Sequence, residues 1–320
     1  MTEQLSLFGE ENTLFNAGVK QLLDMDFDGG LQTLERYGKL FPWGREVRTE
    51  VEIATFWKSK LDQVVWTPID PMEAERLYRI WVEFERTFNY PWREDSIEEQ
   101  LRVVFFSKLA NGLEAGGYST LTKLTGGTPV GLIYLMARRL DVAINSLQTL
   151  IAADPENPKA YGYLGDTYRL RGDARTARLC YREAFVIAPG RVDLARLQDD
   201  ELKERLDELG EDEDQQGDFL EWFPVRAQLE GIFERRVFRD LDDLKHWLQG
   251  YLDLVKAYKK TKDPAFVPRL FYHAMVLSDN APMMRFIKKV DLSEIRRKMK
   301  EWHPGLFARH IMTLDATTVK

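Results

Sequence analysis

The sequence has few of the residues that build disulfides, metal centres and membrane spans. Cys180 is the single cysteine, which excludes an internal disulfide and a cysteine-rich metal site and favours a reducing compartment. No run of about 18 apolar residues occurs, so no transmembrane helix is expected. The first ten residues, MTEQLSLFGE, contain no basic residue and lack the charged front of a secretory signal. These absences predict a cytoplasmic protein.

The sequence also lacks the motifs that mark common catalytic and cofactor sites. None of the four histidines has the three- or four-residue spacing that places two metal ligands on one helix face. There is no Gly-x-x-x-x-Gly-Lys phosphate loop, no Gly-x-Gly-x-x-Gly and no Gly-x-Ser-x-Gly elbow. We therefore expect no catalytic residue, no cofactor and no metal ion. The alternative is an enzyme whose catalytic residues are scattered along the chain.

One stretch, NPKAYGYLGDTYRLRGDARTARLCYREAFVIAP, has the punctuation of two helices joined by a tight turn. Asn157 is a helix cap followed by Pro158 in the first turn, where a missing amide hydrogen costs nothing. Gly172 ends the first helix and Asp173 caps the second. Aromatic and small side chains recur at three- and four-residue steps, as on packed helical faces. These residues are Tyr161, Leu164, Gly165, Tyr168, Ala177, Tyr181 and Ala184.

Together with Pro189, these residues resemble the signature of the tetratricopeptide repeat, a helical hairpin of 34 residues. Residues 158–190 match every signature position, residues 124–157 form a weaker copy, and residues 11–44 form a degenerate third copy. The resemblance implies an all-α fold of helical hairpins stacked as a right-handed α-solenoid, and a protein that works by binding other proteins. No alternation typical of strands contradicts an all-α fold.

The positions of helix caps, helix breakers and charged runs also predict a domain organisation. We predict a flexible N-terminal tail (1–10), a repeat domain (11–210), an acidic linker (211–218) and a C-terminal α-helical region (219–320). A polar helix over residues 193–209 is expected to cover the last repeat. Further helices are predicted at roughly 219–236, 240–261, 264–279, 281–290, 292–302 and 304–314.

The repeat resemblance implies a ligand groove along the first helix of each repeat. Repeats that bind the C-terminal carboxylate of heat-shock chaperones carry Lys and Asn where this chain has Gly162 and Asp166, so such a clamp is disfavoured. The mixed apolar and basic side chains favour an amphipathic helix or an apolar peptide as ligand. In the alternative, the protein's own helices cover the apolar positions. The predicted groove residues are Leu132, Leu135, Met136, Lys159, Asp166, Arg169 and Leu170.

Near the N-terminus, where chain ends are usually poorly ordered, residues Gln4, Leu5, Ser6, Leu7 and Phe8 read QLSLF. This pentapeptide resembles the Gln-Leu-Ser/Asp-Leu-Phe motif by which bacterial replication and repair proteins dock on the sliding clamp. In that family the Gln makes polar contacts and the Leu-Phe pair fills an apolar pocket. The resemblance implies a bacterial protein tethered to the clamp. In the alternative, the three apolar side chains pack on the first helical hairpin.

Charge is distributed unevenly along the chain. From residue 251 onward there are 14 Lys or Arg against 7 Asp or Glu, although the whole chain carries a net charge of -7. A basic end is typical of a nucleic-acid-facing surface or simply of a solvated helix surface. We therefore expect a protein-binding adaptor. A nucleic-acid-binding accessory protein or a helical enzyme that uses the basic C-terminal region is the alternative.

Overall fold

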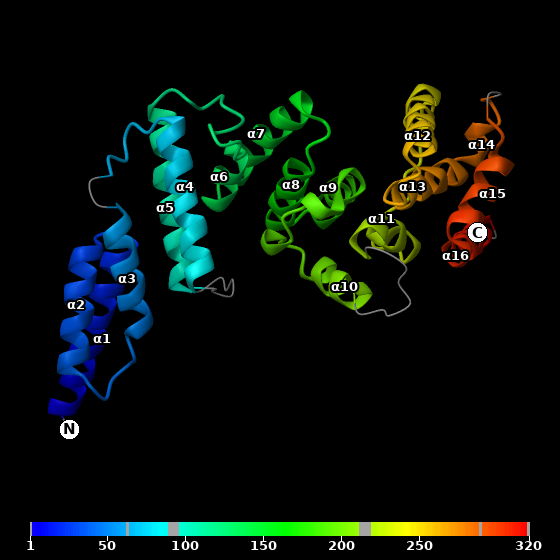
Figure 1. Ribbon diagram of the computed structural model, residues 1–320. Helices are drawn as coiled ribbons and strands as arrows, with labels where there is room; N and C mark the ends of the chain where they lie inside the picture. Colours follow the sequence, from blue (N-terminus) through cyan, green and yellow to red (C-terminus); the bar gives the residue numbers. More distant parts are fainter. Residues whose placement is uncertain (1, 62–63, 89–95, 211–218, 288–289, 319–320) are drawn as a thin grey trace. The chain divides into compact units, whose positions relative to one another are not determined.

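The computed structural model describes residues 2–61, 64–88, 96–210, 219–287 and 290–318, without the side chains of residues 2–8, 209 and 315–318. Within these ranges the chain forms sixteen α-helices and two short 3-10 helices (Figure 1). The described residues contain no β-strand, only an isolated bridge between Lys123 and Pro129. The predicted all-α fold is confirmed. In the described part of the chain, no helix combines the length and the apolar character needed to cross a membrane.

The chain divides into two compact units, residues 1–150 and 151–320. The first unit contains α1 (Thr2–Leu23), α2 (Phe27–Leu40), α3 (Arg48–Leu61), α4 (Pro71–Phe88), α5 (Ile97–Ala115), α6 (Val130–Met136) and most of α7 (Leu140–Ala153). The second begins with α8 (Pro158–Leu170), α9 (Ala174–Ile187), η1 (Pro189–Arg191), η2 (Leu194–Arg196), α10 (Asp200–Gly210) and α11 (Phe219–Leu229). It ends with α12 (Leu241–Thr261), α13 (Phe266–Asp279), α14 (Ala281–Met284), α15 (Leu292–Trp302) and α16 (Pro304–Thr318). The division falls inside the predicted repeat domain, and the predicted linker 211–218 lies outside the described residues.

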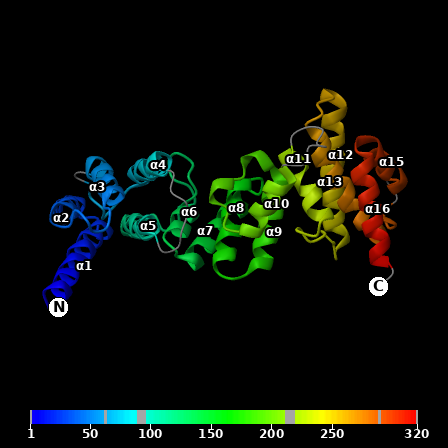
Figure 2. The same ribbon diagram turned by 90° about the horizontal axis from the view of Figure 1, so that it is seen from below.

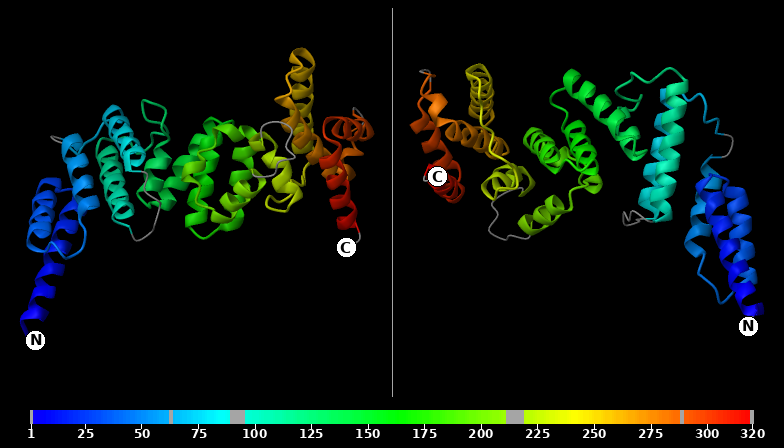
Figure 3. Two further views of the ribbon diagram at one scale, coloured as in Figure 1. Left: turned by 60° about the horizontal axis from the view of Figure 1, so that its bottom comes forward. Right: turned by 180° about the vertical axis from the view of Figure 1, so that it is seen from behind.

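The first two helices form an antiparallel hairpin over the predicted degenerate repeat 11–44. Two glycines lie where the helices approach most closely: a Cβ on Gly18 would sit 2.8 Å from Leu34, and one on Gly30 would sit 2.6 Å from Leu22. Helix α1 begins at Thr2, so the backbone of the predicted tail is helical from its second residue. In Figure 3 this helix, in dark blue, extends past the end of α2 toward the N-terminus.

Helices α3, α4 and α5 of the first unit meet around an aromatic core formed by Trp57, Trp81, Phe84, Phe105 and Phe106, all buried. Ring centroids lie 4.9 Å apart for Trp57 and Phe84, and 5.2 Å apart for Trp81 and Phe105. These separations are those of favourable offset and edge-to-face aromatic pairs. Nothing in the tetratricopeptide signature requires this cluster, which comes from the sequence between the predicted repeats.

In the second unit, α8 and α9 form the hairpin that the sequence predicts. The side chain of Asn157 accepts a hydrogen bond from the amide of Ala160, and that of Asp173 accepts one from the amide of Thr176. Gly172, with a φ of 89°, makes the turn between the helices in a conformation that only glycine adopts easily. A Cβ on Gly165 would lie 2.6 Å from the ring of Tyr181, so glycine is needed for the helices to touch there.

Several helices begin or end away from their predicted positions. The predicted helix 193–209 starts only at Asp200, because the buried carboxylate of Asp199 caps it by accepting a hydrogen bond from the amide of Leu202. The predicted helix 219–236 ends at Leu229, two residues before Gly231, whose φ is 78°. Helices α15 and α16 agree with their predicted starts and lie side by side (Figure 2).

Candidate functional site

The predicted groove residues of the weaker repeat are buried on α6. Leu132, Leu135 and Met136 are 1%, 4% and 3% exposed. Helix α6 packs on α5 within the first unit, and the guanidinium of Arg102 lies 3.4 Å from the sulfur of Met136. These three side chains therefore do not line an open groove. The alternative, in which the protein's own helices cover them, is what the structure shows.

The corresponding face of α8 is covered by residues 192–199, which we call the covering segment. The hydroxyl of Tyr163 donates a hydrogen bond of 2.9 Å to Asp193. The amide of Gln198 donates one of 2.9 Å to the carboxylate of Asp166, and Val192 lies next to Gly162. The covering segment thus contacts the side of α8 on which the repeat resemblance places a ligand.

Among the predicted groove residues of α8, Asp166 is an internal anchor that is only 2% exposed. Its carboxylate accepts a second hydrogen bond, of 2.7 Å, from the hydroxyl of Tyr181. Burial raises the pKa of Asp166 to about 7 and raises that of Tyr181 as well. Arg169 is half-buried, 3.7 Å from Asp199, whereas Lys159 is exposed and Leu170 half-buried. Asp166 thus holds the fold together at the place where a ligand contact was predicted.

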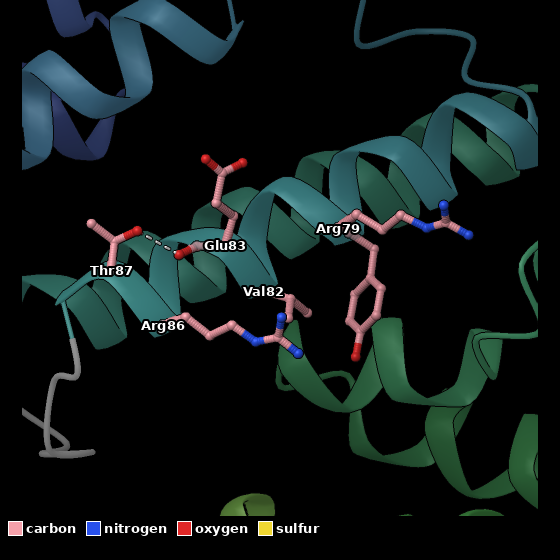
Figure 4. A pocket seen from close by; sticks show the side chains of 6 residues that line it. Arg79, Val82, Glu83, Arg86 and Thr87 are labelled. Atoms are coloured by element: carbon pink, nitrogen blue, oxygen red, sulfur yellow. Dashed lines mark hydrogen bonds between the residues drawn. The ribbon is translucent and has the colours of Figure 1, made fainter.

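An open groove lies instead along α4, a helix that no predicted repeat contains. It has a volume of about 600 Å³ and is lined by Tyr78, Arg79, Val82, Glu83, Arg86 and Thr87, which we call the α4 groove (Figure 4). Figure 4 shows Val82 and Arg86 on one side of the helix and Glu83 on the other. Glu83 pairs with Lys60 at 2.7 Å, and Thr87 donates to the carbonyl of Glu83. Arg86 has no ion pair within the described residues.

The sequence carries a signal for the α4 groove that the repeat signature does not include. Tyr78, Val82 and Arg86 follow one another at four-residue steps, which places them in one row along a helix. The buried residues Leu77, Trp81 and Phe84 occupy a different face of the same helix. Helix α4 therefore presents an apolar face to the aromatic core and a mixed apolar and basic row to the groove. Only the structure shows that this row is left uncovered.

A second cavity, of about 750 Å³, lies at the turn between α1 and α2 and the end of α3. Its charged residues already have partners: Asp28 pairs with Lys58 at 2.5 Å, and Asp26 caps α2 by accepting a hydrogen bond from the amide of Gly29. The first contact joins α2 to α3 and the second caps α2, so both support the fold.

Two of the four histidines and the single cysteine are buried. Burial lowers the pKa of His273 to about 3 and that of His310 to about 4, so both are neutral at pH 7. Burial raises the pKa of Cys180 to about 12, which keeps its thiol protonated. His246 is exposed. Across the described ranges, no three His, Cys, Asp or Glu side chains are grouped as metal ligands.

Basic residues of α15 and of the end of α12 differ in their contacts. On α15, Lys298 lies 3.4 Å from Glu294, Arg297 pairs with both Glu294 and Glu301, and Arg296 donates to the hydroxyl of Ser278. At the end of α12, four exposed lysines form no ion pair within the described residues. We call Lys256, Lys259, Lys260 and Lys262 the lysine cluster.

Residues 4–8, the predicted clamp-docking motif, belong to α1 in their backbone, and their side chains lie outside the described part of the chain. No family model, curated protein or solved structure matches this chain. A proposal for the function must therefore be argued from the residues and surfaces of this chain.

Proposed function

We propose that the protein is a non-catalytic adaptor of the tetratricopeptide type that binds a protein partner in the α4 groove. The observation that carries this proposal is the open groove of about 600 Å³ along one helix face. The positions that the repeat resemblance favoured on α6 are buried, and on α8 Asp166 and Arg169 contact the covering segment. On α4, Tyr78 and Val82 are half-exposed and Arg86 is exposed, and all three line this groove.

The chemistry of the groove suits an amphipathic segment with acidic residues. Tyr78 and Val82 supply apolar contact area, and Arg79 and Arg86 supply guanidinium groups. A guanidinium binds a carboxylate through two parallel hydrogen bonds, and within the described residues no ion pair occupies Arg86. A helical partner that places apolar and acidic residues on one face would match this row.

A photo-crosslinking residue in place of Val82, in the full chain expressed in cells, tests the groove. We expect a discrete crosslinked partner, which disappears when Tyr78→Ala and Arg86→Glu are added. The control places the same crosslinker at Arg76, which is exposed on α4 outside the groove. With the partner purified, Arg86→Glu should weaken its affinity by about tenfold or more, since removal of one charge-assisted hydrogen bond costs about 1.5–3 kcal/mol. Equal crosslinking from both positions, or unchanged affinity, would refute the groove.

We further propose that residues Gln4 to Phe8 tether the adaptor to the bacterial sliding clamp. The match of all five residues supports this, as does the extension of α1 beyond α2. The test is a titration of the full chain, and of a fluorescent peptide of residues 1–12, with purified clamp. Micromolar binding should vanish when Gln4, Leu7 and Phe8 are changed to Ala. Binding that is absent, or equal in the variant, would mean that these residues belong to the fold.

A further inference from the structure

The end of α12 carries a concentration of positive charge that the proposed adaptor function does not use. The four residues of the lysine cluster lie within seven positions, a rise of about 9 Å along a helix. The last of them, Lys262, is a left-handed cap with a φ of 55°, and its amide donates a hydrogen bond of 2.7 Å to the carbonyl of Tyr258. All four side chains are exposed, and the ammonium of Lys262 lies 5.8 Å from the centroid of the Tyr258 ring.

These lysines are not needed to balance acidic groups of the fold. At the other end of the same helix, Lys245 pairs with Asp242 at 2.7 Å, and on α15 Arg297 and Lys298 pair with Glu294 and Glu301. Within the described residues, no such partner approaches the lysine cluster. The two nearby carboxylates are engaged elsewhere, since Asp253 accepts a hydrogen bond from Gln249 and Asp263 accepts one from the amide of Ala265.

The helix terminus accounts for only a small part of this charge. The C-terminal end of a helix carries the equivalent of about half a negative charge, which favours one nearby cation. Four lysines exceed that charge several-fold, even with Asp253 and Asp263 nearby. The surplus creates a local positive potential that attracts a polyanion.

We propose that the lysine cluster binds the phosphate backbone of a nucleic acid, without base recognition. The apolar face of α12, with Leu244, Leu248 and Tyr251, is buried in the second unit. Leu252, at 38% exposure, is the large apolar side chain that α12 leaves exposed. A helix that docks on a lipid surface needs a free apolar face, which α12 does not have.

The residue type favours a point-charge contact with phosphates over specific recognition. The cluster contains four lysines and no arginine, the residue that binds both carboxylates and phosphates through two parallel hydrogen bonds. Lysine binds phosphate as a point charge, and interactions of that kind are sequence-independent and weaken steeply with salt. This inference stands independently of the α4 groove and of the clamp motif, because it uses none of their residues.

The test is fluorescence anisotropy of a labelled DNA duplex of mixed sequence, titrated with the full chain over a series of salt concentrations. In the test variant all four residues of the cluster are changed from Lys to Gln. We expect its affinity to fall by about tenfold or more at low salt. The slope of log K against log salt should become shallower by about 0.9 for each phosphate that the variant no longer binds. The matched control, Arg297→Gln with Lys298→Gln, removes two ion-paired charges and should bind like the wild type.

A variant with all four lysines changed to Arg keeps the charge and should keep the binding, which distinguishes a missing charge from a misfolded chain. Three results would overturn the proposal: no anisotropy change with the wild-type chain, an equal decrease in the α15 control, or a decrease in the Lys-to-Arg variant. Tighter binding to vesicles of phosphatidylserine, or to polyglutamate, with the same lysine dependence would also overturn it. The cluster would then be a membrane-facing or acidic-protein-binding surface.

Discussion

The α3–α5 region of the first unit and the α8–α9 hairpin of the second are stabilised by different kinds of contact. The first is held by five large rings that contact one another in the aromatic core. The second is held by a close glycine-to-tyrosine approach and by a buried carboxylate that accepts two hydrogen bonds. The first depends on filled volume, which is insensitive to pH. The second depends on backbone proximity and on the protonation of one acid.

The largest loss of stability is expected from a substitution in the aromatic core. Phe105→Ala removes a fully buried ring that contacts Trp57 and Trp81, and cavities of that size cost about 3–5 kcal/mol of unfolding free energy. Hydrogen exchange followed by mass spectrometry should show faster exchange in α3–α5 and unchanged exchange in α8–α9. Phe105→Leu, which leaves most of the volume filled, should cost much less. Equal destabilisation by the two variants would contradict a role for the filled volume.

A pair of glycines on one helix tests the proximity argument for the hairpin. Gly165→Ala places a methyl group 2.6 Å from the ring of Tyr181 and should destabilise the second unit by about 1–3 kcal/mol. In Gly162→Ala the new methyl group would lie 3.7 Å from Val192, which is an ordinary contact distance. This variant should leave the unfolding free energy unchanged or raise it by up to about 1 kcal/mol, because alanine is the better helix former. Urea unfolding of both variants gives the comparison. Two variants of equal stability would show that the helices can separate at no cost.

The protonation of Asp166 should make the second unit sensitive to pH. Its pKa is about 7 in the folded chain, against an ordinary value of 3.8, so the folded state binds a proton that the unfolded state lacks between those values. The unfolding free energy therefore falls as pH rises through this interval, by at most about 1.4 kcal/mol per pH unit. In Asp166→Asn, which retains an oxygen acceptor, this contribution disappears. Urea unfolding across the interval should show the stability of the wild type falling relative to the variant, and parallel curves would contradict the assignment.

The smallest expected effect concerns the covering segment. Tyr163→Phe removes the hydrogen bond to Asp193 and should cost about 0.5–1.5 kcal/mol. Amide exchange of residues 192–198 should become faster, while exchange in the aromatic core stays unchanged. Tyr161→Phe is the control, because the hydroxyl of Tyr161 makes no hydrogen bond within the described residues. Equally fast exchange in both variants would contradict a specific role for the hydrogen bond between Tyr163 and Asp193.

The sequence predicted those parts of the fold that depend on local signals. The caps Asn157 and Asp173 and the turn at Gly172 define α8 and α9 because each acts on residues within one helical turn. The start of α10 was mispredicted because Asp193, Asp199 and Asp200 are equally good caps in sequence. Burial of Asp199 against its neighbours selects one of them.

The candidate site was less predictable because exposure depends on residues far away in the sequence. Leu132, Leu135 and Met136 have the composition of a groove, but α5 covers them. Asp166 is a charged residue at a position where the repeat resemblance places a ligand contact. Its carboxylate instead accepts a hydrogen bond from the amide of Gln198, 32 residues away. Tyr78, Val82 and Arg86 form an equally visible row on α4, and nothing in their spacing shows that this row stays open.

The covering segment occupies the face of α8 on which the repeat resemblance places a ligand, so a free ligand would compete with the chain itself. A tethered segment has an effective concentration of about a millimolar at its site. A free peptide of equal intrinsic affinity, present at about a micromolar, would then occupy roughly one molecule in a thousand. A weak free ligand would therefore not displace the covering segment from α8. A partner that binds at ordinary cellular concentrations should therefore bind a surface that no described segment of the chain covers. The α4 groove is such a surface.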